Sequence, residues 1–67
     1  MIYRCYFLTE PEIKLARRFV DDETALRWFA AMWHAVKADH PHVCNGYLFK
    51  ARGKLVKHVQ QTKYEII

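Results

Sequence analysis

The N-terminal part of the chain has the hydrophobic pattern of a β-hairpin. Residues 2–8 are mostly β-branched, aromatic or aliphatic, and Pro11 marks the turn that follows them. Apolar and basic side chains largely alternate in residues 13–20, although Arg17 interrupts the alternation. We therefore expect a second strand there, paired with the first. A helix is the alternative, because residues 12–18 are also good helix formers.

A single amphipathic helix is predicted from the acidic residues 21–23 to about residue 38. These carboxylates suit an N-cap and the first turn, where the helix dipole favours negative charge, and the residue before Pro41 ends the helix. One apolar stripe is expected to face the core: Ala25, Leu26, Phe29, Met32, Trp33 and Val36. Trp28 lies at the margin of this stripe, so it either covers the edge of the sheet or is exposed.

Residues 47–60 predict a second hairpin. A three-residue loop with Gly53 in the left-handed conformation fits a type I turn with a bulge. This turn pairs Lys50 with Lys54 and Tyr47 with Lys57, and directly opposite residues share a face. One face is apolar, with Lys57 at its margin: Tyr47, Phe49, Leu55 and Val59. The other is cationic and half apolar: Leu48, Lys50, Lys54, Val56 and His58.

The order of elements predicts an α+β fold in a single domain of residues 1–67. We expect a small antiparallel sheet of four or five strands in β-β-α-β-β order, with one helix packed on one face. The sequence leaves open whether the last segment continues as one long strand or forms a fifth strand at residues 64–67. The chain has 67 residues, 52% of them hydrophobic, so it is globular but short. A chain of this size buries only about 60% of its unfolded surface, so we also consider a homodimer.

The net charge of +4 lies in the C-terminal part of the chain. Residues 1–42 carry six basic and six acidic groups, whereas residues 43–67 carry five basic groups and one acidic group. This asymmetry indicates an anionic partner. The candidate binding residues, interleaved with Tyr47, Phe49 and Tyr64, are Lys50, Arg52, Lys54, Lys57, His58 and Lys63. Because lysine predominates, we expect contacts to the phosphate backbone rather than to base edges; the alternative is that these lysines only keep an exposed strand soluble.

A second candidate surface consists of Arg17, Arg18 and Trp28. Arginine and tryptophan are enriched at the energetically dominant positions of protein interfaces. These residues suggest docking on a larger protein, although a tryptophan at the margin of a helix stripe is more often half-buried core.

No residue pattern predicts a metal, a cofactor or an enzymatic activity. His34, His40, His42 and Cys44 are ligand types that zinc prefers, but one comes from the helix and three crowd a short extended segment. A catalytic cysteine needs a supporting histidine and a substrate cleft, for which a domain this small has little room. The two glycines form no phosphate-binding loop.

The two cysteines, Cys5 and Cys44, predict a reduced, cytoplasmic protein. Disulfide-stabilised secreted domains of this size usually contain about four to eight cysteines, and we recognise no secretory signal. No apolar run approaches the roughly 18 residues of a membrane span, so we expect a soluble protein with no membrane partner.

Together these features predict a small, basic, non-enzymatic binding module. We expect it to engage nucleic acid, or a nucleic-acid-bound protein assembly, through its cationic C-terminal hairpin. The alternative is a protein-binding inhibitor or adaptor, of the kind that phages and mobile elements encode, which docks on a larger enzyme complex through Arg17, Arg18 and Trp28. The salt dependence of binding distinguishes the two, because binding that neutralises phosphates is steeply salt-dependent.

Overall fold

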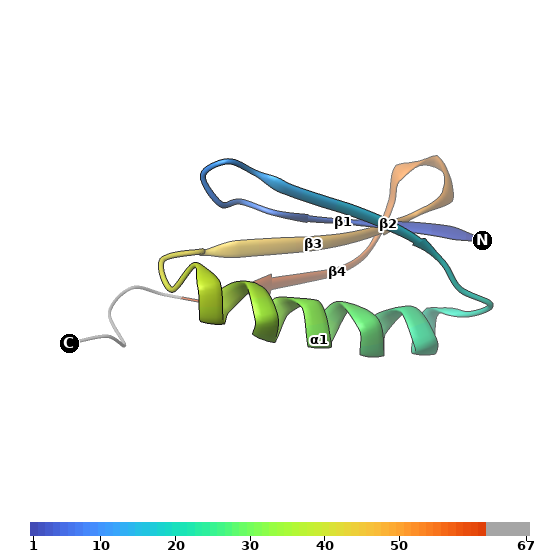
Figure 1. Cartoon of the computed structure of the whole chain (residues 1–67). Helices are drawn as coiled ribbons and strands as arrows, with labels where there is room; N and C mark the ends of the chain where they lie inside the picture. The colour runs from blue at the N-terminus through green and yellow to red at the C-terminus, as the bar shows by residue number, and fades with distance from the viewer. Residues whose placement is uncertain (62–67) are drawn as a thin grey trace.

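The computed structural model describes residues 1–61 as a four-stranded antiparallel sheet with one helix against one face (Figure 1). The strands lie in the order β2-β1-β3-β4. Along the chain the elements are β1 (Ile2–Phe7), β2 (Ile13–Arg18), α1 (Asp22–Asp39), β3 (Asn45–Lys50), the short 3-10 helix η1 (Ala51–Gly53) and β4 (Lys54–Gln60). The predicted α+β class and order of elements are confirmed. The question of a fifth strand at residues 64–67 lies outside the described residues.

The N-terminal hairpin forms as the sequence predicts, and the helical alternative for residues 12–18 is wrong. The two strands pair antiparallel, with Cys5 opposite Leu15 and Phe7 opposite Ile13. On its other side β1 pairs with β3, so β1 and β3 are the central strands while β2 and β4 are the edges of the sheet.

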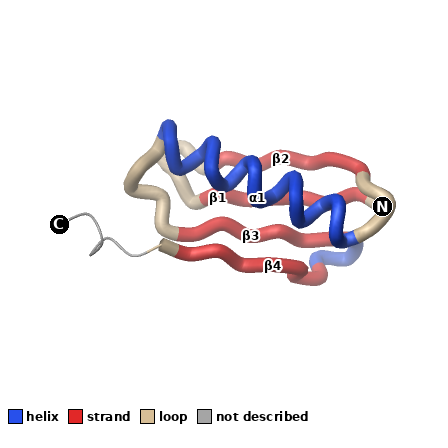
Figure 2. Tube along the Cα trace, turned by 90° about the horizontal axis from the view of Figure 1, so that it is seen from below, coloured by secondary structure: helices blue, strands red, loops and turns tan. Residues whose placement is uncertain are grey.

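The core lies between α1 and the two central strands. Figure 2 shows α1 crossing one face of the sheet obliquely and leaving β4 uncovered. The ring of Phe7 stacks on Phe29, with 5.6 Å between centroids, and on Trp33, with 6.0 Å. The predicted helix stripe is confirmed, since the buried residues of α1 all belong to it: Ala25, Phe29, Trp33 and Val36. Trp28, at its margin, is half-buried.

Asp21 caps the first turn of α1. Its carboxylate accepts hydrogen bonds from the backbone N–H of Thr24, at 2.8 Å, and from the Thr24 hydroxyl, at 2.7 Å. These bonds favour the ionised carboxylate and lower the pKa of Asp21. At the other end the N–H of His40 donates to the Val36 carbonyl at 2.7 Å. The helix ends there, because a residue that precedes proline avoids the helical conformation.

The β3–β4 hairpin contains a bulge that changes the predicted pairing. Next to the turn the strands pair as predicted, but farther along the register shifts because β4 contains one extra residue, Val56. The prediction that Tyr47 lies opposite Lys57 is therefore wrong, and Tyr47 lies opposite His58 instead. The bulge lets the half-buried Val56 pack against the core.

Judged by charge alone, the apolar face of this hairpin would lie against α1 and the cationic face would lie away from it. The structure has the opposite arrangement. The face that the sequence marks as cationic is turned toward α1, where Leu48 pairs with Cys5 and is fully buried. The apolar face, with Tyr47 and Phe49, lies on the other side of the sheet, and no other element of residues 1–61 covers it (Figure 1). The uncovered face is therefore the candidate binding surface.

Candidate nucleic-acid interface

Positive charge in the described structure is concentrated in the sheet. The four strands contain no Asp or Glu and seven basic residues: Arg4, Lys14, Arg17, Arg18, Lys50, Lys54 and Lys57. In contrast, α1 contains two basic and three acidic residues: Arg27, Lys37, Asp22, Glu23 and Asp39. The molecule thus has a cationic sheet layer and a weakly acidic helix layer, which a charge count along the chain does not reveal.

We call the side of the sheet away from α1 the open face. Cross-strand partners share a face, and the pairs that link Tyr6 to Tyr47 and Tyr47 to His58 extend the open face across β1, β3 and β4. Its side chains include Arg4, Tyr6, Lys14, Arg18, Tyr47, Phe49, Leu55 and His58.

Aromatic rings form a continuous row on the open face. Tyr6 and Phe49 meet edge to face, with 5.6 Å between centroids and 69° between planes. Tyr47 lies nearly parallel to Phe49 at 6.2 Å and stacks on the His58 ring at 4.6 Å. His58 Nε2 is 2.9 Å from Asn45 Oδ1, which fixes the imidazole in this position. Such a row can contact several bases of one nucleic-acid strand, because every base has an apolar π-face.

Three basic side chains share the open face with the aromatic row. Arg4 pairs across the strands with Phe49, and Lys14 pairs with Tyr6, so both lie directly beside the rings. Arg18 lies on the same face near the far end of β2. Lys14 Nζ is 3.6 Å from a carboxylate oxygen of Glu12, whereas neither arginine forms an ion pair within residues 1–61. These two guanidinium groups are therefore available for an anionic ligand.

A hollow of about 430 Å³ lies at the end of the aromatic row next to η1. It is lined by Arg4, Tyr6, Phe49, Lys50 and Gly53, and we call it the η1 hollow. Figure 1 shows the loop between β3 and β4 bending away from α1, to the side of the open face. Gly53 has the left-handed conformation that the sequence predicts, with φ 72°, but Arg52 before it also has a positive φ of 65°, so the predicted type I turn is wrong. The two left-handed residues turn the hairpin tip toward the open side.

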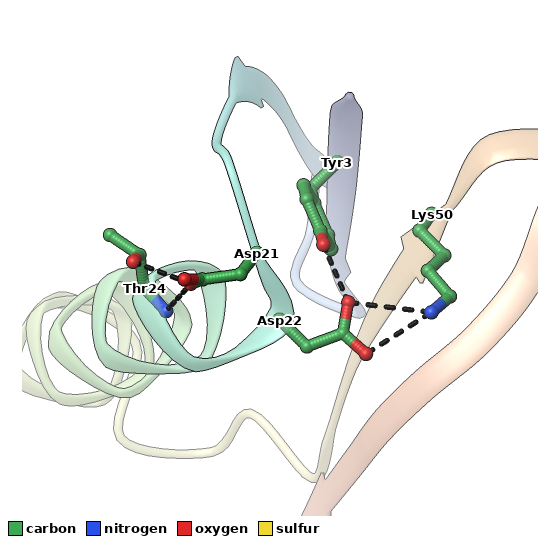
Figure 3. Close-up of polar contacts among 5 residues, drawn as sticks. All are labelled: Tyr3, Asp21, Asp22, Thr24 and Lys50. Atoms are coloured by element: carbon green, nitrogen blue, oxygen red, sulfur yellow. Dashed lines mark hydrogen bonds and ion pairs between the residues drawn. The ribbon is translucent and has the colours of Figure 1, made fainter.

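Lys50, which the sequence places in the binding set, is part of a structural network instead. Its ammonium is 3.1 Å from a carboxylate oxygen of Asp22, and the Tyr3 hydroxyl donates to the same carboxylate at 2.5 Å (Figure 3). The hydrogen bond from Tyr3, and then that from Lys50, lower the pKa of Asp22, while the same contact raises the pKa of Tyr3 to about 12. This network joins the first turn of α1 to β1 and β3.

The other predicted cations do not form one surface. Lys54 and Lys57 are exposed but project from the side of β4 that faces α1. Arg52 is exposed at the hairpin tip, and His58 lies on the open face. Lys63 and the neighbouring Tyr64 lie outside the described residues. The predicted set is therefore split between the two sides of the sheet, because of the bulge and the position of the helix.

The second predicted surface is brought together in part. The Arg17 guanidinium lies over the Phe19 ring, 5.4 Å from its centroid, and Trp28 packs on the same ring at 5.2 Å. Arg18 projects to the open face instead. Since Trp28 is half-buried in this cluster, its contacts also serve the edge of the core.

Three residues of the open face were not predicted from the sequence: Arg4, Tyr6 and Lys14. The signal was present in the alternation of β1, whose alternate residues Tyr3, Cys5 and Phe7 are all buried. The residues between them must project to the opposite face, because successive side chains of a strand alternate. The charge count along the chain obscured this set, since acidic residues in the loops and in α1 cancel these basic groups in the sum over residues 1–42.

The two cysteines are free, and one of them is deeply buried. Cys5 is 0% exposed, and burial raises the pKa of its thiol to about 11. Such a thiol is protonated at neutral pH and out of reach of a substrate. The Cys44 thiol lies 3.4 Å from the His42 carbonyl oxygen. Across residues 1–61, no three His, Cys, Asp or Glu side chains lie close enough together to hold a metal ion.

Within the part of the chain that the structure describes, α1 is too polar to cross a membrane. Comparison of the chain with protein-family models, with curated proteins and with solved structures gives no match.

Proposed function

We propose that the protein binds nucleic acid through the open face of its sheet. The observation that carries this proposal is a row of aromatic rings that no element of residues 1–61 covers, with Arg4 and Arg18 on the same face and without an ion pair among those residues. Basic side chains bind the phosphate backbone and aromatic side chains contact the bases. A nucleic-acid ligand agrees with the cytoplasmic location that we expect from the sequence.

A polyanion fits the open face better than a second copy of the chain does. Face-to-face dimerisation would bring Arg4, Lys14 and Arg18 of both copies into one interface. Like charges in a desolvated interface are unfavourable, whereas phosphates neutralise them. The four strands supply no carboxylate for pairing with those cations.

Two double variants with the same net charge test which side of the sheet binds. Arg4→Glu with Arg18→Glu reverses two cations of the open face, and Lys54→Glu with Lys57→Glu reverses two on the other side. Each pair removes two positive charges and adds two negative ones, so the net charge falls from +4 to 0. Lys50→Glu is unsuitable, because it would place a second carboxylate beside Asp22.

Binding is measured by the fluorescence anisotropy of a labelled oligonucleotide over a series of salt concentrations, with circular dichroism to verify folding. We expect the open-face variant to lose affinity and its salt slope to become shallower by about 0.7–0.9 per lost phosphate contact. The Lys54/Lys57 variant should retain most of its affinity. Equal losses in the two variants would contradict the open-face site, and no binding by the unaltered protein would contradict nucleic-acid binding altogether.

A protein-docking function remains the second candidate, and the corner formed by Arg17, Phe19 and Trp28 favours it. Next to this corner Val20 is 91% exposed and adds apolar surface to it. This function is that of an inhibitor or adaptor that docks on a larger enzyme complex. Loss of partner binding on Trp28→Ala, with little dependence on salt, would support it over the open-face site.

A further inference from the structure

We propose that the η1 hollow binds one unpaired base, so that the preferred ligand is a single strand rather than a duplex. This inference rests on the proposed function and adds the structural class of the nucleic acid. It is carried by the hollow, by the two rings in it, by Arg4 in its lining and by the neighbouring hairpin tip that contains Arg52.

The size and lining of the η1 hollow suit a flat, aromatic ligand group. Its volume of about 430 Å³ lies within the range of about 300–1,000 Å³ that small-ligand sites have. Tyr6 and Phe49 stand at 69° to each other in it. A base that stacks on one of these rings meets the edge of the other, and both arrangements are favourable between aromatic groups.

Cations are placed where the phosphates that flank such a base would lie. Arg4 lines the hollow and is the cross-strand neighbour of Phe49. Arg52 belongs to the tip that bends over the same side, and its φ of 65° is uncommon for a residue other than glycine. Residues held in this conformation cluster at ligand sites, where the strain is offset by function.

A duplex does not supply the group that this hollow accepts. Bases within a duplex are stacked and paired, so only a strand with unpaired bases can insert one without the cost of unpairing it. The flat part of the open face, by contrast, contacts phosphates of either form. Affinity for a single strand should therefore exceed affinity for a duplex of the same sequence, and the difference should depend on the rings of the hollow.

The test compares Phe49→Ala with Tyr47→Ala, which removes a ring of the same row outside the hollow and should therefore cost less single-strand affinity than Phe49→Ala does. The probe is a labelled oligonucleotide of about 12 nucleotides, offered as a single strand and annealed to its complement. Stacking is worth about 1–3 kcal/mol per base, so Phe49→Ala should weaken single-strand binding roughly 5- to 150-fold. Duplex binding and the salt slope should stay unchanged, because no phosphate contact is lost.

Phe49→Trp provides a second measurement that keeps a stacking ring. This variant should bind the single strand as the unaltered protein does, and a base stacked on the new indole should quench its fluorescence. The natural tryptophans, Trp28 and Trp33, lie on α1 across the sheet and supply a constant background.

Two outcomes separate failure of this inference from failure of the proposed function. The base site would be overturned by equal affinity for single strand and duplex, together with equal effects of Phe49→Ala and Tyr47→Ala and no quenching in Phe49→Trp. The open face would then remain as a backbone-binding surface. Absence of binding to either form by the unaltered protein would overturn both.

Discussion

The two faces of the sheet are built by the same strands but have opposite properties. On the side covered by α1, alternate residues of β1 are almost completely buried, with Tyr3 1% exposed and Phe7 0% exposed. On the open face, Ile2 is 39% exposed and Leu55 is 51% exposed, and the aromatic residues between them are only half-buried. The first face accounts for the stability of the fold. The second contains half-buried aromatic residues and basic residues, and the binding site that we propose lies there.

The two faces also differ in whether their basic residues have carboxylate partners. On the covered side Lys50 reaches Asp22, and this ion pair helps to attach α1 to the sheet. On the open face Arg4 and Arg18 have no carboxylate partner within residues 1–61. A cation with a nearby carboxylate adds little to phosphate binding, since its charge is already compensated. The location of a basic residue relative to α1 is therefore more informative than its position along the chain.

The largest contrast is expected between two phenylalanines on opposite faces. Phe7→Ala removes a ring that stacks on both Phe29 and Trp33, and it should cost about 3–5 kcal/mol of unfolding free energy. Phe49→Ala removes a half-buried ring and should cost about 1 kcal/mol. Chemical denaturation of both variants measures the difference. Equal costs would mean that the open face is part of the core and would remove the basis for a separate binding surface.

Periodicity in the sequence predicts the elements and the core face of α1, because these depend on neighbours within a few residues. The register of the second hairpin is different. The extra residue Val56 leaves the local alternation of hydrophobic and charged residues almost unchanged, but it exchanges the faces of Lys57 and His58. The bulge is stabilised by packing of Val56 against the core, and that contact depends on the whole fold.

The candidate site was harder to predict than the fold, for a related reason. Lys50 and Asp22 are 28 residues apart, so their ion pair is absent from any local pattern. From the local sequence alone, Lys50 is therefore predicted to be a surface cation without an ion pair. The open face has the converse problem, because its basic residues come from β1 and β2 while much of its aromatic row comes from β3 and β4. Only the pairing of β1 with β3 brings these two groups together.

A smaller effect is expected where the covered face is most tightly packed. Gly46 lies on this face opposite Phe7, and a Cβ atom there would be 2.8 Å from one carbon of the Phe7 ring and 2.9 Å from another. Gly46→Ala should therefore destabilise the fold by about 1–3 kcal/mol through overpacking. Gly53→Ala is the matched control, because its added methyl group meets no atom within 4 Å and its cost comes only from the positive φ. A stability unchanged by Gly46→Ala would show that the covered face is loosely packed.

Acid should weaken the attachment of α1 to the sheet. The hydrogen bonds from Tyr3 and Lys50 lower the pKa of Asp22, so its contribution to stability is fully present above the unfolded value of about 3.9 and is lost as the pH falls through the lower folded value. Urea unfolding from pH 7 to pH 2 measures this loss. Asp22→Asn should be less stable at pH 7 and show a shallower decline below pH of about 4.

Asp39→Asn is the control for the acid titration. It removes a carboxylate from the other end of α1, one that forms no side-chain hydrogen bond or ion pair within residues 1–61. Its decline in acid should match that of the unaltered protein. The same decline in Asp22→Asn would contradict the role of the Tyr3–Asp22–Lys50 network.

The smallest change in stability is expected for Arg52→Asn at the hairpin tip, which should nevertheless change binding. Asparagine tolerates the left-handed conformation better than other residues with a side chain, so Arg52→Asn preserves the turn while removing the charge. Stability should stay within about 0.5 kcal/mol. Because the tip bends toward the open face, the salt slope for a single strand should become shallower by about 0.7, the value of one phosphate contact.

Lys54→Gln is the matched control for Arg52→Asn. It also lowers the net charge by one, from +4 to +3, but on the side that faces α1, so the salt slope of its binding should change little. If the two variants reduce the slope equally, the protein responds to total charge alone, and the two faces of the sheet do not differ in function.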